Sequence, residues 1–237
     1  PYSVIGPGVV LGDGCKLESH VVIGGNTTLG PKNHVFSFAS IGLQPQDLKY
    51  RGEQSSLEIG SNNVIREYVT MNPGTEGGVM LTKVGDDSLF MVGAHVAHDC
   101  KVGNHVVMAN ATLLGGHVHV HDHATLSGGV AVHHFTTIGS YSFVGGLSRV
   151  IHDVPPYMLA DGNPARPRCI NIVALKRNDF ETDQISALAD AHRMMYRAKV
   201  GMEHAREFLR ANTQLLPCVE ILLDFVQTQQ NGRHGRG

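Results

Sequence analysis

An aliphatic residue returns at every sixth position over most of the first 150 residues of the chain. One frame of this repeat runs from Ile5 to Ile41 and resumes over residues 59–71. A second frame, shifted by one residue, has an apolar side chain at all twelve positions from Val84 to Val150. An α-helix repeats every ~3.6 residues and a strand every ~2. A period of six therefore excludes a long helix and indicates short strands separated by regular corners.

Small residues follow the repeated apolar positions, and this accounts for much of the glycine, 28 of 237 residues. A corner needs a residue that accepts unusual backbone angles or allows a close backbone approach. Three strands with their corners make one triangular coil, and coils stack at about 4.8 Å with their aliphatic side chains inward. Because aromatic residues are only 6% of the chain and Trp is absent, we expect ladders of Val, Ile and Leu as the core.

The repeat predicts a parallel β-helix over residues 1–158. Two segments interrupt its frame, 43–58 and 73–83, and we expect both to loop out from coil corners. The sequence starts inside a repeat, at Pro1 without Met, which indicates that the N-terminus is trimmed.

A junction loop and a small helical domain are expected over residues 159–237. Paired prolines after Val150 stop the strand stacking. Apolar residues at helical spacing then follow Thr182, an N-cap candidate, and continue in two further helices. The polar tail from about Gln227 is predicted to be disordered.

Composition excludes several classes of protein. The net charge is −2 and charged residues are 17% of the chain, so no basic field indicates a nucleic-acid partner. No apolar run approaches the ~20 residues that span a bilayer, and the first residues lack the basic and apolar regions typical of a signal peptide. The four cysteines show no CxxC spacing, so neither a disulfide framework nor a thiolate zinc site is expected. We expect a cytoplasmic protein.

Histidines are concentrated in a few successive coils, nine of the 15 lying between residues 95 and 134. His98, His117 and His133 are spaced by about one coil and should meet near one corner, with His95 across it. Such a cluster can bind a metal ion or supply a general base. We interpret four others as exposed strand or turn residues, His105, His119, His121 and His123.

Several stretches, in order along the chain, resemble the UDP-N-acetylglucosamine O-acyltransferase family of lipid A synthesis. They are SFASIG (37–42), QDLKYRGE (46–53), AHVAHDCKVGN (94–104), ANATLLGGH (109–117), AVHHF (131–135), VGG (144–146), DVPPYMLADGNPAR (153–166) and NIVALKR (171–177). The resemblance implies a left-handed parallel β-helix and a homotrimer with sites between chains. It also implies transfer of a 3-hydroxyacyl chain from acyl carrier protein to the glucosamine 3-hydroxyl of UDP-N-acetylglucosamine. No metal and no cofactor are implied beyond the phosphopantetheine of the carrier protein.

The same resemblance assigns roles to individual residues. His98 corresponds to the general base, and the backbone N–H of Gly116 to the donor for the oxyanion. Gly146 corresponds to the position that limits acyl length, and glycine there predicts a long chain. The remaining positions match substrate-binding residues: Asp47, Lys49, His95, His117, His133, His134, Asn171 and Arg177.

The next two residues after His98, Asp99 and Cys100, are less strongly indicated as catalytic residues. Asp99 follows His98, but adjacent strand residues point to opposite faces, which argues against a contact. Cys100 is expected to be a packing residue. A local basic cluster, Arg166, Arg168, Lys176 and Arg177, is either a solvated turn or a surface for the acidic carrier protein.

Three residues depart from the common family pattern and weaken the expected nucleotide contacts: Pro73, Val173 and His134. Other hexapeptide-repeat enzymes remain alternatives, namely serine or sugar acetyltransferases and the N-acyltransferase that acts later on UDP-3-O-acylglucosamine. A β-helix carbonic anhydrase is a weaker alternative, because no two histidines here are five residues apart. A structural β-solenoid would leave the histidine corner unexplained.

Overall fold

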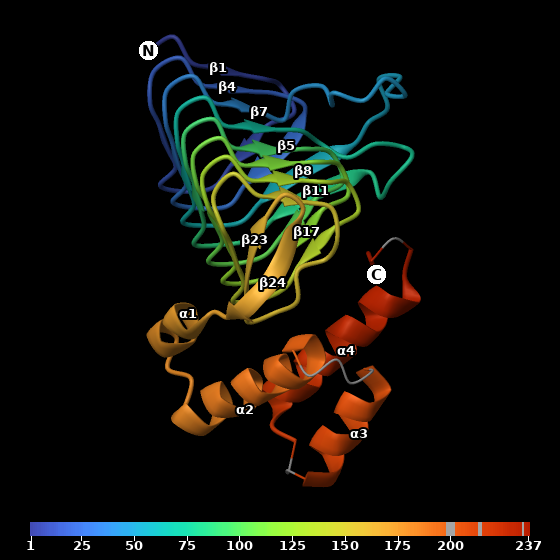
Figure 1. The fold of residues 1–237 in the computed structure, drawn as a ribbon. Helices are drawn as coiled ribbons and strands as arrows, with labels where there is room; N and C mark the ends of the chain where they lie inside the picture. Colours follow the sequence, from blue (N-terminus) through green and yellow to red (C-terminus); the bar gives the residue numbers. More distant parts are fainter. Residues whose placement is uncertain (198–201, 213–214, 234) are drawn as a thin grey trace.

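Short parallel strands stack into a triangular prism, and helices cover one end of it (Figure 1). The computed structural model describes residues 1–197, 202–212, 215–233 and 235–237. The chain forms a left-handed parallel β-helix, as expected from the resemblance. None of the helices in these ranges is both long and apolar enough to cross a membrane.

Each face of the prism is one sheet in which every third strand of the chain is a neighbour. The first sheet contains β1 (Val4–Ile5), β4 (Val22–Ile23), β7 (Ser40–Ile41), β10 (Thr70–Met71), β13 (His95–Val96), β16 (Leu113–Leu114), β19 (Ala131–Val132) and β22 (Arg149–Val150). The second contains β2 (Val10–Leu11), β5 (Asn26–Leu29), β8 (Ser56–Ile59), β11 (Leu81–Val84), β14 (Lys101–Val102), β17 (His119–Val120) and β20 (Thr137–Ile138). The third contains β3 (Lys16–Leu17), β6 (His34–Val35), β9 (Val64–Ile65), β12 (Leu89–Phe90), β15 (Val107–Met108), β18 (Thr125–Leu126), β21 (Phe143–Val144), β23 (Met158–Gly162) and β24 (Ala165–Ile170).

Aliphatic ladders fill the prism, because the pairing register places each repeated apolar residue over the next. Ile23 pairs with Ile41, which pairs with Met71, and all three are fully buried. Burial of such side chains contributes about 25 cal/mol per Å² of apolar surface. The six-residue frame therefore predicted the core correctly from Ile23 to Val150, whereas its first positions, Ile5 and Leu11, are exposed.

Glycine is required at the corners for close approach more than for its backbone angles. A Cβ on Gly60 would lie 2.7 Å from the carbonyl oxygen of Gly85 in the next coil. The left-handed positions of the coils are instead held mostly by other residues, including His117 and Tyr141, with φ near +60°. Of the two explanations for the glycine repeat, close approach is the main one at these corners.

Both expected excursion loops leave the prism, and their insertions show in the register. Ser40 pairs with Thr70, and Thr70 with His95, whereas an uninterrupted coil pairs residues such as Val4 and Val22. The last residues of both predicted loops, 56–58 and 81–83, lie in β8 and β11. They extend these strands because they pair with the coil strands next to them.

The polypeptide leaves the prism through an antiparallel pair. β23 pairs in parallel with β21, and β24 then pairs antiparallel with β23. The helical region follows, with α1 (Ile172–Arg177), α2 (Thr182–His192), the π-helical turn η1 (Arg193–Arg197), α3 (Met202–Asn212) and α4 (Pro217–Asn231). Its buried core is separate from that of the prism and includes Leu175, Leu188 and Leu222.

Two local expectations for the helical region are wrong. Glu181, rather than Thr182, is the N-cap of α2, because its side chain and that of Gln184 form a capping box. The predicted tail from Gln227 is helical as far as Asn231, and hydrogen bonds such as Thr228 Oγ1 to Asp224 O and Gln229 Nε2 to Asp153 O hold this polar last turn. Residue 234 lies outside the described residues.

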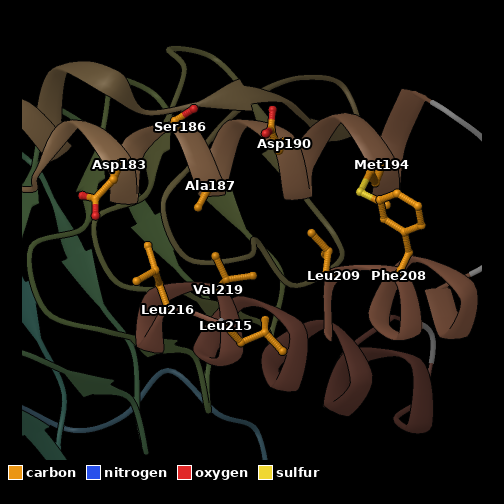
Figure 2. Close-up of a pocket in the computed structure, with 10 residues that line it drawn as sticks. All are labelled: Asp183, Ser186, Ala187, Asp190, Met194, Phe208, Leu209, Leu215, Leu216 and Val219. Carbon is orange, nitrogen blue, oxygen red and sulfur yellow. The ribbon is translucent and has the colours of Figure 1, made fainter. Parts of the chain in front are cut away.

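A groove of about 480 Å³ lies between α2, α3 and α4 (Figure 2). Apolar side chains such as Met194, Phe208 and Leu216 line it, with Asp183 and Asp190 on α2. None of the histidines of the prism corner lines this groove, so it is separate from the candidate site described next.

Candidate active site

A cavity of about 580 Å³ lies at one corner of the prism, against the first excursion loop. It brings together residues from distant parts of the sequence, among which the predicted site residues are Asp47, Lys49, His98, Gly116, His117 and His134. The corner is built by stacking, because His117 N donates to His98 O at 3.0 Å and Phe135 N donates to Gly116 O at 3.1 Å.

His98 and Asp99 form the central contact of this cavity. His98 Nδ1 lies 2.9 Å from Asp99 Oδ2. The sequence-based argument against this contact is wrong, because Asp99 lies outside any strand, with a left-handed φ of 59°. The alternation of a regular strand does not apply at such a corner, and the two side chains can face each other.

The Asp99 carboxylate is almost completely buried but is well supplied with donors. Thr75 Oγ1 donates to Oδ2 at 2.7 Å, and Val79 N donates to Oδ1 at 2.9 Å. Burial favours the neutral acid, but the hydrogen bonds from Thr75, His98 and Val79 outweigh it and hold the pKa of Asp99 below its ordinary value. The carboxylate is therefore ionised at neutral pH.

An ionised carboxylate can only accept hydrogen bonds, so His98 Nδ1 carries the hydrogen. The neutral imidazole then has its lone pair on Nε2, which is the atom needed by a general base. Gly116 lies beside this atom: a Cβ added to Gly116 would be 2.6 Å from His98 Nε2. Glycine at 116 is thus required by the ring of His98.

The backbone N–H of Gly116 is a free donor at this place. Among the residues that the structure describes, no acceptor pairs with it. An unpaired N–H at a residue that lines the same cavity as His98 could donate to an oxyanion formed there.

His117 and His134 complete the histidine wall of the cavity. The ring of His117 meets His98 edge-on, with centroids 5.1 Å apart, and stacks on Phe135 at 4.3 Å. Burial, with repulsion from His98, lowers the pKa of His117, and Asp99 and Asp47 partly offset this. Burial also lowers the pKa of His134, together with the nearby His133 and Arg236. Both rings are therefore favoured in the neutral form.

The two excursion loops are tied together above the corner. Glu76 N donates to Glu53 Oε1 at 3.2 Å, and Asn72 Nδ2 donates to Leu43 O at 3.0 Å. In the first loop, Asp47 Oδ1 accepts from Lys49 N at 3.0 Å, which makes a local turn. This arrangement places Asp47 and Lys49 at the cavity.

Three predicted residues line neither this cavity nor the next. His95, on β13, is largely buried and bonds with Thr70 Oγ1 at 2.7 Å through Nδ1, and burial lowers its pKa. His133 packs on His134 with ring centroids 3.8 Å apart. Gly146 is exposed, and a Cβ there would meet Gly128 O at an ordinary 3.4 Å.

A second cavity, of about 390 Å³, lies at the next corner of the prism and receives Asn171 and Arg177. Asn171 is held there by its own hydrogen bonds, donating from Nδ2 to Tyr141 O at 2.9 Å and accepting from Ala174 N at the start of α1. Val173 also lines this cavity. The two cavities therefore divide the predicted substrate-binding residues between two corners of one chain.

His105 and His123, expected to be exposed strand or turn residues, also line the second cavity; His105 is exposed and His123 is half-buried. His105 stacks on His123, and His123 on Tyr141, each with centroids 4.6 Å apart. Their spacing of one coil was the signal that could have identified this ladder.

Cys100 has no place in the chemistry of the site. Its side chain is fully buried, Sγ donates to Gly115 O at 3.1 Å, and burial raises its pKa to about 12. The thiolate needed for nucleophilic attack is therefore not formed at neutral pH. The expectation of a packing residue is confirmed.

The ligand atoms of His98, Asp99 and His117 all lie within 4.8 Å of one another, so these three could hold a metal ion. Both oxygens of Asp99 already accept hydrogen bonds from Thr75, His98 or Val79. A metal ion would have to displace His98 Nδ1 from Asp99. The donors around Asp99 therefore favour the His98–Asp99 hydrogen bond over a metal site.

Comparison with known proteins finds a matching family model and a similar sequence. The family model described as Udp N-acetylglucosamine O-acyltransferase, Domain 2, matches residues 153–235. The chain is 47% identical, over 98% of its length and 90% of the relative, to the acyl-[acyl-carrier-protein]–UDP-N-acetylglucosamine O-acyltransferase of Syntrophobacter fumaroxidans.

Solved structures show the same likeness in three dimensions. LpxA from Acinetobacter baumannii is 40% identical with a TM-score of 0.86, covering 94% of this chain and 92% of its own. The UDP-N-acetylglucosamine acyltransferase of Francisella novicida is 36% identical with a TM-score of 0.91, covering 96% of this chain and 84% of its own.

Proposed function

The chain belongs to the UDP-N-acetylglucosamine O-acyltransferase family, and from this premise we propose that His98 is the general base of a direct acyl transfer. The reaction moves an acyl group from acyl carrier protein to UDP-N-acetylglucosamine in lipid A biosynthesis. We propose which oxygen of the sugar accepts the acyl group, how the transfer occurs and which residues catalyse it. The observation that carries it is the hydrogen bond from His98, which lines the corner cavity, through Nδ1 to Oδ2 of the buried Asp99.

In the proposed reaction, His98 Nε2 accepts the proton of the glucosamine 3-hydroxyl as that oxygen attacks the thioester carbonyl carbon. Asp99 accepts from Nδ1 throughout and stabilises the imidazolium that forms. The Gly116 N–H donates to the oxyanion of the tetrahedral intermediate. The intermediate then expels the pantetheine sulfur, which takes the proton from His98 Nε2. The proton balance closes without a nucleophilic side chain of the enzyme.

Lys49 and Asp47 provide the polar side of the same cavity. Both lie on the first excursion loop and line the cavity with His98. An ammonium group suits a phosphate, and a carboxylate suits sugar hydroxyls. We assign these two residues, with His117, His134 and their neighbour His133, to binding of the substrates. His95 supports the coil below through Thr70.

We also propose a homotrimer, as the family resemblance implies; the division of substrate-binding residues between two corners supports a site shared between chains. Asn171 and Arg177 line the second cavity, whereas His98 lines the first. Packing of the first corner of one chain against the second corner of another would form one complete site from two chains. Repeating this contact around a threefold axis closes a ring of three. Arg177 is exposed and its planar guanidinium suits a diphosphate.

The acyl donor is proposed to be a long 3-hydroxyacyl chain on the phosphopantetheine of acyl carrier protein. Gly146 is exposed and presents no side chain at the prism surface, so it leaves room there for the acyl chain. The exposed basic residues Arg166, Arg168, Lys176 and Arg177 offer a surface for the acidic carrier protein. The cytoplasmic location stays a prediction of the sequence.

The direct test is incubation of the purified protein with UDP-N-acetylglucosamine and a panel of 3-hydroxyacyl carrier proteins, with the product mass read by mass spectrometry. We expect a monoacylated sugar nucleotide, with the ester on the glucosamine 3-oxygen by NMR. Acylation of a different acceptor, such as an acylated glucosamine with a free amine, would instead favour the related N-acyltransferases.

A further inference from the structure

The last turn of α4 and the described residues that follow it contact the coil after His133. Gln229 Nε2 donates to Asp153 O at 2.9 Å, and Asp153 N donates to Gly235 O at 2.8 Å. Gly237 N donates to Asp153 Oδ2 at 2.7 Å, while Oδ1 of the same carboxylate accepts from Thr137 N. Asp153 is buried, so this segment is fastened to the prism at a defined place.

Gly235 shapes the segment so that its next residue can reach the prism corner. Its φ is +69°, and a Cβ there would lie 2.7 Å from His152 Nδ1. Both the left-handed backbone and the close contact require glycine. The following residue, Arg236, is thereby directed to the pair His133 and His134.

Arg236 makes two hydrogen bonds at this corner. Its Nη1 lies 2.7 Å from His133 Nδ1 and 2.8 Å from His134 O. A guanidinium group stays protonated and can only donate. His133 Nδ1 must therefore be an acceptor, which makes the ring neutral with its hydrogen on Nε2.

We propose that Arg236 is a positioning residue that holds His133 as the neutral tautomer protonated on Nε2, so that His133 offers an N–H donor to a bound substrate. The assignment of the tautomer rests on the contacts of Arg236 alone. The role toward substrate rests on the proposed function. His133 is next to the wall of the active-site cavity, because its ring packs on His134, which lines that cavity.

The same geometry indicates what His133 does when Arg236 is removed. His133 Nδ1 also lies 3.1 Å from His134 O. With Arg236 present, both atoms accept from one guanidinium nitrogen. Without it, Nδ1 keeps a hydrogen bond to the protein by carrying the hydrogen and donating to His134 O. The tautomer is then reversed, and Nε2 changes from a donor to an acceptor.

The tautomer can be read in the full chain without substrate, by two-bond ¹⁵N–¹H correlations of the imidazole rings. The measurement is made near pH 8, above the ordinary pKa of histidine, ~6.5, and His133→Gln assigns the signals. We expect hydrogen on Nε2 of His133 in the wild type and in Arg236→Lys, and on Nδ1 in Arg236→Ala. The exposed Arg233, on the same segment, is the matched control, and Arg233→Ala should keep the wild-type tautomer.

Hydrogen on Nδ1 of His133 in the wild type would overturn the proposal. This measurement uses no variant, so it still decides if Arg236→Ala loosens the whole segment. An unchanged tautomer in Arg236→Ala would overturn it as well. Kinetics then test the role toward substrate. Loss of one hydrogen bond should raise the KM of one of the two substrates by up to about tenfold, with kcat changed less than about twofold.

Arg236→Lys should restore this KM, and Arg233→Ala should leave it unchanged. A KM in Arg236→Ala equal to that of Arg233→Ala would refute the substrate role of His133. A wild-type protein that transfers no acyl group would refute the proposed function instead, while the NMR result would still decide the tautomer.

Discussion

His98 and Asp99 are adjacent in sequence and are hydrogen-bonded through their side chains, with His98 Nδ1 2.9 Å from Asp99 Oδ2. The contact exists because Asp99 occupies a left-handed corner position and because the loop residues Thr75 and Val79 supply the buried carboxylate with donors. It determines the tautomer of His98 and leaves Nε2 free to accept a proton.

His98→Ala should lower kcat by about 10²- to 10⁴-fold, the range of general acid–base catalysis. The side chain is partly exposed to the cavity, at 17%, so its removal should leave the fold intact. The measurement is the initial rate with saturating substrates, alongside the thermal midpoint. His121→Ala, on the exposed surface away from this cavity, is the control. A rate near that of the wild type would exclude His98 as the base.

Asp99→Asn should lower kcat by about 100-fold or more while KM changes little. The amide nitrogen of the substituted side chain is itself a donor, so it would face donors that now bind the Asp99 carboxylate. An amide N–H that faces His98 would also move the ring hydrogen of His98 from Nδ1 to Nε2. Steady-state kinetics and the ¹⁵N signals of His98 report the two effects. Asp86→Asn removes another carboxylate that accepts a backbone N–H and should lower only stability. Equal activity losses in both variants would mean that Asp99 is merely structural.

The free energy of unfolding should fall as the pH is lowered from about 7.5 to 5.5. Burial lowers the pKa of His95 and His117 in the folded protein. Below the ordinary pKa of ~6.5 the unfolded chain binds protons that these folded rings do not, so stability is lost toward acid. Each such ring contributes up to about 1.4 kcal/mol per pH unit. Thermal midpoints at one protein concentration test this, and His95→Gln should reduce the slope. A stability that rises toward acid would contradict it.

Gly146→Met should shift the preference of the enzyme toward shorter acyl chains. The backbone accepts a side chain here, because the added Cβ meets its neighbours at ordinary contact distances, and the new side chain would occupy the space proposed for the acyl chain. Competition between carrier proteins with long and short chains measures the shift. Leu147→Met, at the neighbouring exposed position, changes the adjacent corner residue and should not alter the preference. If Gly146→Met and Leu147→Met keep the same long-chain preference, Gly146 does not limit the acyl length.

Mixing two inactive variants should restore activity if each site is shared between chains. His98→Ala and Arg177→Ala alter different cavities of one chain. In a randomly mixed trimer, about a quarter of the sites receive an intact His98 from one chain and an intact Arg177 from its neighbour. We expect about that fraction of wild-type activity after co-refolding or co-expression. Complete inactivity of verified mixed trimers would show that both residues act within one chain.

Repetition made much of the fold predictable. The six-residue period determined the length of a coil, the inward positions and the places where loops leave the prism, because the same backbone geometry returns with every turn. Ile23, Ile41 and Met71 are stacked as their spacing predicts once the first loop is removed. His98 and His117 lie together because their spacing in the sequence is about one coil.

The contacts that break the repeat depended on the tertiary structure. Asp99 meets His98 because a corner departs from strand alternation, and its pKa is set by Thr75 and Val79 from a loop that has no period. Arg236 reaches His133 from a distant part of the chain through a segment that composition alone marks as disordered. Sequence determined the scaffold and the stacking of His98 with His117, since local spacing fixes which side chains stack. Only the folded chain decided their hydrogen-bond partners, because loops and the last segment approach the corner through contacts that no local pattern encodes.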